Sequence, residues 1–111
     1  MKITQFDIWL ADLNPSRETE LGKTRPVVII QTDLLNENHL STIVCPISTN
    51  IKADVNLLRV HLIEGQLDQL SDVLVDQIRA IDNKRLIKKI GQLNKKQILK
   101  IKENIRIVLD L

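Results

Sequence analysis

Aromatic side chains are almost missing from this chain, since Phe6 and Trp9 are the only two and tyrosine is absent. Proteins that hold single-stranded nucleic acid by stacking its bases need a platform of aromatic side chains. The composition therefore argues against such a platform. The formal net charge is also small, at +2, which argues against a general nucleic-acid binder that relies on electrostatic attraction alone.

Cysteine and long apolar runs are scarce as well. The single cysteine, Cys45, excludes an internal disulfide and fits a reducing compartment, and we expect it to be a small apolar core residue. No apolar run approaches the 18 or so residues of a membrane span, and no charged, apolar and small-residue leader opens the chain. With 111 residues, residues 1–111 are expected to form one cytosolic domain with no membrane partner.

Short apolar runs bounded by turn residues predict β-structure over most of the chain. Strands are expected at residues 5–13, 26–32, 41–47, 57–62 and 72–81. Short strands of this kind suggest a small barrel or sandwich, with a long polar loop at 14–25 that has a functional role. Pro46 is expected at a strand end, an edge or a bulge, because it cannot donate to a ladder.

The C-terminal region changes to a helical pattern. Asn94 and Gln97 form an Asn-x-x-Gln capping pattern, and apolar residues then recur at helical spacing at Ile98, Ile101, Ile105 and Val108. Shorter turns are expected at 33–38 and 82–89. The helix carries basic residues that form either a solvated face or a surface for RNA or a partner: Lys95, Lys96, Lys100, Lys102 and Arg106.

The segment from Gly22 to Ile30 combines a cation with a rigid strand. Arg25 precedes Pro26, which fixes its own φ and favours an extended conformation for Arg25. The β-branched run Val27–Ile30 that follows is typical of a buried strand. A positive charge held where a loop meets a strand suits an anion, and phosphate is the first candidate.

Three segments together resemble the MazF/PemK family of toxin ribonucleases. These are DIWLADLNPSRETELGKTRPVVIIQTD, IVCPIST and VLVDQIRAID, which occur in the family's order and spacing. The resemblance runs from Phe6 to about Leu111 and favours the MazF branch. It implies an α+β fold that is mainly β, a small SH3-like β-barrel of five to seven strands with short helices and a C-terminal helix.

The resemblance also implies an activity and partners. Family members are homodimeric toxins of type II toxin–antitoxin systems that cut single-stranded RNA, here taken as mRNA, without a metal or other cofactor. The products carry a 2′,3′-cyclic phosphate and a 5′-hydroxyl, and a MazE-like antitoxin blocks the RNA channel. Two alternatives stay open, a barrel that binds RNA or protein without catalysis and a CcdB-like topoisomerase poison. CcdB-type poisons carry a tryptophan near the C-terminus, whereas the tryptophan here is Trp9.

The catalytic residues implied by the resemblance are Arg25, Ser48 and Asp76. Arg25 would hold phosphate oxygens, or alternatively pair with Glu20 as a structural residue. Ser48 stands where the family usually has threonine and keeps the hydroxyl, although Thr49 fills this role if a bulge shifts the strand. Asp76 would act as the base or orient Arg25, or alternatively form an internal salt bridge with Arg79 or Arg25.

The remaining site residues are expected to contact RNA. Those in the long loop are expected to line the RNA groove, although a basic loop residue such as Lys23 is equally consistent with simple solvation. Gln77 offers an amide donor and acceptor for a base edge. The expected RNA-binding residues are Arg17, Glu20, Lys23, Thr24, Thr49, Gln77 and Arg79.

Overall fold

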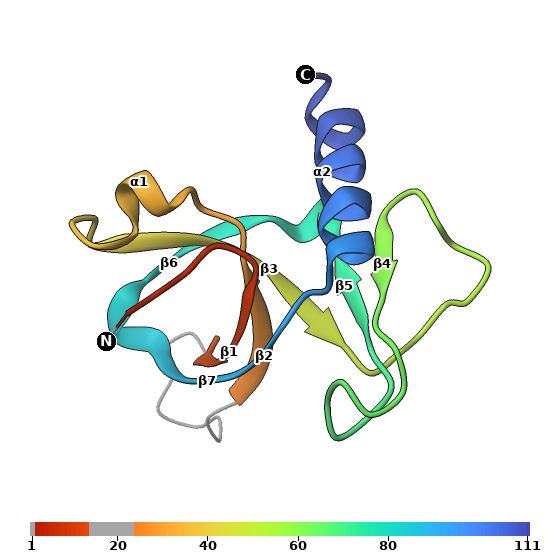
Figure 1. The fold of residues 1–111 in the computed structure, drawn as a ribbon, viewed down its shortest axis with the longest axis horizontal. Coiled ribbons are helices and arrows are strands. Elements are labelled where there is room, and N and C mark those ends of the chain that lie inside the picture. The colour runs from red at the N-terminus through yellow and green to blue at the C-terminus, as the bar shows by residue number, and fades with distance from the viewer. Residues whose placement is uncertain (1, 14–23) are drawn as a thin grey trace, which may run out of the picture.

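The computed structural model describes residues 2–13 and 24–111. The strands are β1 (Asp7–Asp12), β2 (Thr24–Ile29), β3 (Ser41–Ser48), β4 (Arg59–His61), β5 (Asp72–Leu74), β6 (Arg79–Asp82) and β7 (Leu86–Gln92). The helices are α1 (Asp33–Asn36) and α2 (Lys95–Leu109), with 3-10 turns η1 (Val75–Gln77) and η2 (Asn83–Arg85). Figure 1 shows β1, β2, β3, β6 and β7 curling around one another, with β4, β5 and α2 beside them.

The strands form one antiparallel sheet of seven strands in the order β4-β5-β3-β2-β1-β7, with β6 paired to the first half of β3. Among the described residues no ladder joins β6 to β7, so the barrel is open at that corner. The predicted small β-barrel with short helices and a C-terminal helix is confirmed.

Two apolar cores lie on opposite faces of this curled sheet. One contains Ile8, Val28 and Cys45 and is covered by α2 through Ile101. The other contains Trp9 and Val27 and fills the inside of the curl. Neighbouring residues of a strand point to opposite faces, so Val27 and Val28 enter different cores, which explains why the β2 run is apolar without alternation.

β3 changes partners along its length, and Pro46 lies at the change. β6 pairs with Ser41–Val44, whereas β5 pairs with Ile47 and Ser48. Cys45 and Pro46 therefore pair only with β2 among the described residues. This interruption is a local strand edge, where the missing N–H of a proline leaves no ladder bond unmade.

Two expectations for the second half of the chain were wrong. Residues 72–81 do not form one strand but are divided by η1 into β5 and β6, because the sequence must cross from one half of β3 to the other. Residues 82–89 contain not only a turn but also the start of β7, which pairs with β1. In β7 only Leu86 is buried, and the three residues after it are all exposed. The strand therefore has no alternation of buried and exposed residues that the sequence could have revealed.

The capping pattern at the start of α2 is confirmed. Asn94 Oδ1 accepts a hydrogen bond from the Gln97 N–H at 2.8 Å, and Gln97 Oε1 accepts one from the Asn94 N–H at 3.0 Å. Gln97 also exchanges two hydrogen bonds of 2.8 Å with Gln66, which ties the segment before β5 to the helix. Ile98, Ile105 and the rest of the predicted apolar stripe face the α2-covered core.

Replacing Asn94 with alanine is expected to lower the free energy of unfolding by about 1 kcal/mol, because the first turn of α2 loses its side-chain acceptor. Urea unfolding followed by circular dichroism would measure the difference. Asn94→Ser, which restores an acceptor, should recover most of it. A stability for Asn94→Ala equal to that of the wild type would contradict the capping role.

Candidate active site

Arg25 is the second residue of β2 and pairs with Ala11 of β1. Its side chain is exposed, and within residues 2–13 and 24–111 no hydrogen bond or ion pair engages its guanidinium. Pro26 and the buried residues after it fix the backbone that carries the side chain. The alternative pairing partner, Glu20, lies outside the described residues. Arg25 thus presents an accessible positive charge on a rigid stretch of backbone.

Ser48 ends β3 at the same end of the sheet. The pairing of β2 with β3 ends at Val27 and Pro46, so Arg25 lies two residues before this pair on β2 and Ser48 two residues after it on β3. Ser48 is itself paired with Asp72 on its other side. Residues that face each other across antiparallel strands share a face of the sheet. The exposed Arg25 and the half-buried Ser48 therefore both lie at this end of the sheet, where β2 and β3 stop pairing.

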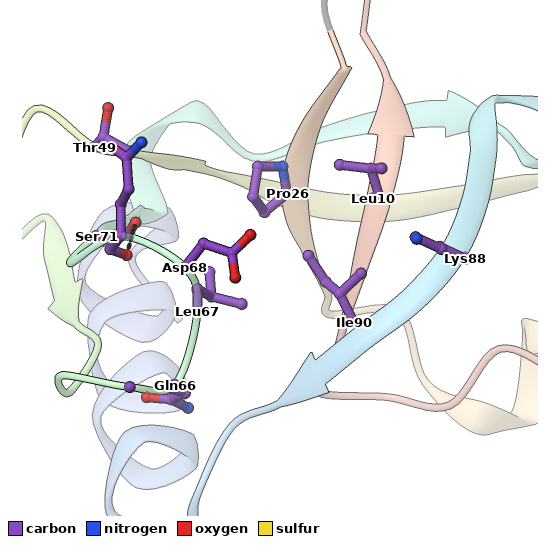
Figure 2. Close-up of a pocket in the computed structure, with 11 residues that line it drawn as sticks. Leu10, Pro26, Thr49, Gln66, Leu67, Asp68, Ser71, Lys88 and Ile90 are labelled. Atoms are coloured by element: carbon purple, nitrogen blue, oxygen red, sulfur yellow. Dashed lines mark hydrogen bonds between the residues drawn. The ribbon is translucent and has the colours of Figure 1, made fainter.

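A groove of about 480 Å³ opens on the other face of these strand ends. Leu10, Pro26 and Ile90 give it apolar walls, while Lys88 and Asp68 supply charge. Figure 2 shows the Asp68 carboxylate directed into the space between its own loop and β2. The volume is within the range of sites for small ligands, so the groove can accommodate a nucleotide-sized group.

Only one of the predicted site residues, Thr49, lines this groove among the described residues. Arg25 does not line it, because it points to the face opposite that of its neighbour Pro26. Thr24 lies two residues before Pro26 and is exposed. Sequence analysis missed Leu10, Asp68 and Lys88, which come from three separate segments. Arg17, Glu20 and Lys23 lie outside the described residues.

The remaining predicted site residues form a second group farther along β3. Asp76 and Gln77 belong to η1 and Arg79 begins β6, so none of them lies in the single strand expected from the sequence. All three are exposed. Arg79 pairs with Val44, which is four residues from Ser48, on the order of 13 Å along the strand. The described residues include no salt bridge or hydrogen bond between Asp76 and Arg25, Ser48 or Arg79.

Cys45 lies behind this second group and is inert. Burial, with the nearby charge of Asp76, raises the pKa of the Cys45 thiol to about 12. A thiol with this pKa stays protonated at neutral pH and is a poor nucleophile. Its buried position agrees with the expected role as a small core residue.

A buried carboxylate next to Ser48 was not found by sequence analysis. Asp72 is 1% exposed and accepts hydrogen bonds from Arg59 Nη1 at 3.0 Å, His61 Nδ1 at 2.7 Å and the Lys52 N–H at 2.9 Å. The only available signal was the spacing of Arg59 and His61, which puts both on one face of a strand. The pairing of that strand with Asp72 could not be read from the sequence.

The surroundings of Asp72 favour its charged form. Burial alone would raise its pKa, but the hydrogen bonds from the Lys52 N–H, His61 and Arg59, with the charge of His61, outweigh it and hold the pKa below the ordinary value of 3.8. The charged form is therefore more favourable in the folded protein than in the unfolded chain. Asp72 contributes stability that is present above the unfolded pKa and is lost as the pH falls through the folded one.

This linkage predicts a difference in acid sensitivity. Between about pH 5 and pH 2, the free energy of unfolding of the wild type should fall more steeply than that of Asp72→Asn, whose side chain does not titrate. Urea titrations at successive pH values would give both curves. Parallel curves over this range would show that the Asp72 carboxylate has the same pKa in both states.

The described residues contain no helix long and apolar enough to cross a membrane. They also contain no group of three or more histidine, cysteine, aspartate and glutamate side chains placed to share a metal ion.

Comparison with known protein families gives a match over almost the whole chain. The model described as "PemK-like, MazF-like toxin of type II toxin-antitoxin system" matches residues 4–109. Two curated relatives are named Endoribonuclease MazF. The one from Staphylococcus epidermidis is 36% identical over 111 residues, covering 98% of this chain and 92% of the relative. The one from Staphylococcus saprophyticus is 37% identical over 107 residues, covering 95% and 89%.

Solved structures share the fold. The Mycobacterium tuberculosis toxin MazF-mt6 superposes with a TM-score of 0.79 at 26% identity, covering 95% of this chain and 97% of that one. A chain from a MazE–MazF crystal structure of Deinococcus radiodurans gives a TM-score of 0.85 at 16% identity, covering 100% and 98%. At this lower identity the second likeness shows the fold alone.

Proposed function

This chain belongs to the family of PemK-like, MazF-like toxins of type II toxin–antitoxin systems, and we propose that, as an endoribonuclease of that family, it cuts single-stranded messenger RNA in the cytoplasm. The two curated relatives named Endoribonuclease MazF, which match nearly its full length, support the activity. The observation that carries the proposed site is that the exposed Arg25 and the half-buried Ser48 each lie two residues from the last β2–β3 pair, at the same end of the sheet.

The proposed reaction is an internal transfer of the phosphoryl group. The ribose 2′-oxygen attacks the adjacent phosphorus and gives up its proton, while the bond from phosphorus to the 5′-oxygen breaks and that oxygen takes a proton. The products are a 2′,3′-cyclic phosphate and a 5′-hydroxyl. Negative charge grows on the two other phosphoryl oxygens, and the planar guanidinium of Arg25 is suited to hold both at once.

Ser48 supplies a second donor beside Arg25. Its hydroxyl oxygen already accepts a hydrogen bond from the Asn50 N–H at 3.0 Å, which leaves the hydroxyl hydrogen free to donate to a phosphoryl oxygen. Two fixed donors aimed at developing charge are a common source of rate enhancement. The Arg25 guanidinium and the Ser48 hydroxyl can together stabilise the charge on the phosphoryl oxygens. We propose on this basis that cleavage does not depend on a metal ion.

RNA in this proposal crosses the end of β2. The scissile phosphate lies at Arg25 and Ser48, and a neighbouring nucleotide occupies the groove beside Thr49. Its base rests on Pro26 and Leu10 instead of an aromatic ring. Asp76, Gln77 and Arg79 lie farther along β3, so we propose that they contact more distant nucleotides, with Asp76 also a candidate base.

We further propose a homodimer that is inhibited by a MazE-like antitoxin. Support comes from the solved MazE–MazF complexes with the same fold. Exposed apolar side chains on α2 and at its C-terminal end, including Leu99, Ile107 and Leu111 at 70%, 49% and 84% exposure, offer surface that a second chain would cover.

Incubation of the purified protein with a mixed-sequence single-stranded RNA in excess chelator tests the activity. We expect discrete fragments whose 5′ ends accept phosphate from a kinase without prior phosphatase treatment, because the leaving oxygen becomes a hydroxyl. A matched RNA with a 2′-deoxyribose at the mapped site should resist cleavage there, since the attacking oxygen is missing.

Cleavage of the deoxy-substituted site would contradict attack by the 2′-oxygen. Cleavage that stops in chelator and returns with Mg²⁺ would contradict metal independence alone. Binding of RNA with no cleavage in any buffer would favour the non-catalytic barrel.

A further inference from the structure

The segment that follows Ser48 is tied to a buried ion pair. Asp72 is 1% exposed, and its Oδ2 accepts hydrogen bonds from the Lys52 N–H at 2.9 Å and from Arg59 Nη1 at 3.0 Å. Its Oδ1 is 2.7 Å from His61 Nδ1, which must carry the proton because a carboxylate only accepts. A buried carboxylate is tolerated when it is paired and fully hydrogen-bonded, and these three donors satisfy Asp72.

The Arg59 nitrogen that contacts Asp72 also contacts Asn50, the residue that is hydrogen-bonded to Ser48. Arg59 Nη1 donates to the Asn50 carbonyl oxygen at 2.7 Å as well as to Asp72. The Asn50 N–H then donates to Ser48 Oγ at 3.0 Å. A continuous set of contacts therefore leads from the Asp72 carboxylate through Arg59 and Asn50 to the Ser48 hydroxyl.

The pairing of β3 with β5 places Asp72 and Ser48, the first and last residues of this set of contacts, next to each other. Asp72 is the direct cross-strand partner of Ser48 on β5, and His61 is the partner of Asp72 on β4. The turn at Asn50 is consequently held from its carbonyl by Arg59 and two residues later from the Lys52 N–H by Asp72. Both anchors are side chains rooted in strands, which hold a geometry more closely than a loop does.

We propose that Asp72 and Arg59 are positioning residues for RNA cleavage, which fix the Asn50 turn so that the Ser48 hydroxyl points at the phosphate. The inference rests on the proposed function, because it acts through Ser48. The Asn50 N–H occupies the hydroxyl oxygen, so the remaining freedom of the hydroxyl is its hydrogen, and a fixed turn keeps that hydrogen available to the phosphoryl oxygen. Small displacements of a catalytic group are costly, with about 1 Å worth up to about 100-fold in rate.

A double-mutant cycle on kcat separates this role from simple stabilisation. Asp72→Asn replaces one carboxylate oxygen by an NH2 group, which would face the N–H donors that now bind this carboxylate. We expect kcat to fall about 10- to 100-fold, with KM changed less than about threefold. In the Ser48→Ala background the same change should lower kcat less than about threefold, because the hydroxyl it positions is gone. All rates are measured at a temperature where each variant is folded.

Arg59 provides a second variant that leaves the carboxylate in place. Arg59→Met removes the bridge between Asp72 and Asn50, and kcat should fall as for Asp72→Asn. Arg59→Lys keeps one ammonium near both acceptors and should recover part of the loss. Hydrogen exchange gives a readout without activity, since the Lys52 amide should exchange faster in Asp72→Asn.

Asp7→Asn is a matched control. Asp7 is another buried carboxylate, 5% exposed and paired with Lys89 at 3.3 Å, and it lies on β1 with no contact to the Asn50 turn. This change should lower stability and leave kcat unchanged.

Each outcome decides between the two proposals. A wild type that does not cut RNA overturns the proposed function and this inference with it. A wild type that cuts RNA, combined with equal effects of Asp72→Asn in the presence and absence of the Ser48 hydroxyl, overturns only the positioning role. Unchanged kcat in both Asp72→Asn and Arg59→Met does the same.

Discussion

Arg25→Ala is expected to lower kcat for RNA cleavage by about 100- to 1,000-fold, the usual cost of losing one donor that stabilises transition-state charge. The side chain is exposed and makes no hydrogen bond or ion pair with other described residues, so its removal should leave the barrel intact. Single-turnover cleavage of one defined RNA, with thermal unfolding measured in parallel, would separate the catalytic loss from any loss of fold.

Arg25→Lys is the matched control for this prediction. Lysine keeps the positive charge but lacks the planar fork that contacts two oxygens at once, so its rate should lie between those of the wild type and Arg25→Ala. Cleavage at the wild-type rate by a folded Arg25→Ala protein would remove Arg25 from the site.

Ser48→Ala is expected to lower kcat by about 10- to 100-fold, since a hydrogen bond to a charged group contributes about 1.5–3 kcal/mol. Ser48→Thr should keep most of the activity, because threonine retains the hydroxyl and suits a strand. The measurement is the same single-turnover assay, with fragment ends mapped to verify that the cut site is unchanged.

Thr49→Ala distinguishes Ser48 from its neighbour. Thr49 lines the groove on the other side of the strand end, so its loss should alter binding of a nearby nucleotide and change KM more than kcat. If Thr49→Ala alone abolished cleavage while Ser48→Ala were active, the site would be shifted by one residue.

Local features of this protein were determined by the sequence. The Asn94 cap and the apolar stripe of α2 depend on residues three or four apart, and both were predictable. The extended start of β2 follows from Pro26 and the β-branched residues after it. The local pattern around Pro26 made Arg25 a candidate for binding an anion, whereas the proposed catalytic roles of Arg25 and Ser48 came from the family resemblance and not from periodicity.

Contacts between distant strands were decided only by the tertiary structure. The pairing of β2 with β3 brings Arg25 and Ser48 to the same end of the sheet. The pairing of β3 with β5 then sets Asp72 beside Ser48, and the pairing of β5 with β4 sets His61 beside Asp72. Splitting residues 72–81 around η1 moves Asp76 away from this end. A one-residue change of register would turn each of these side chains to the other face, and that register is set by the whole packed sheet, which no short stretch of sequence specifies.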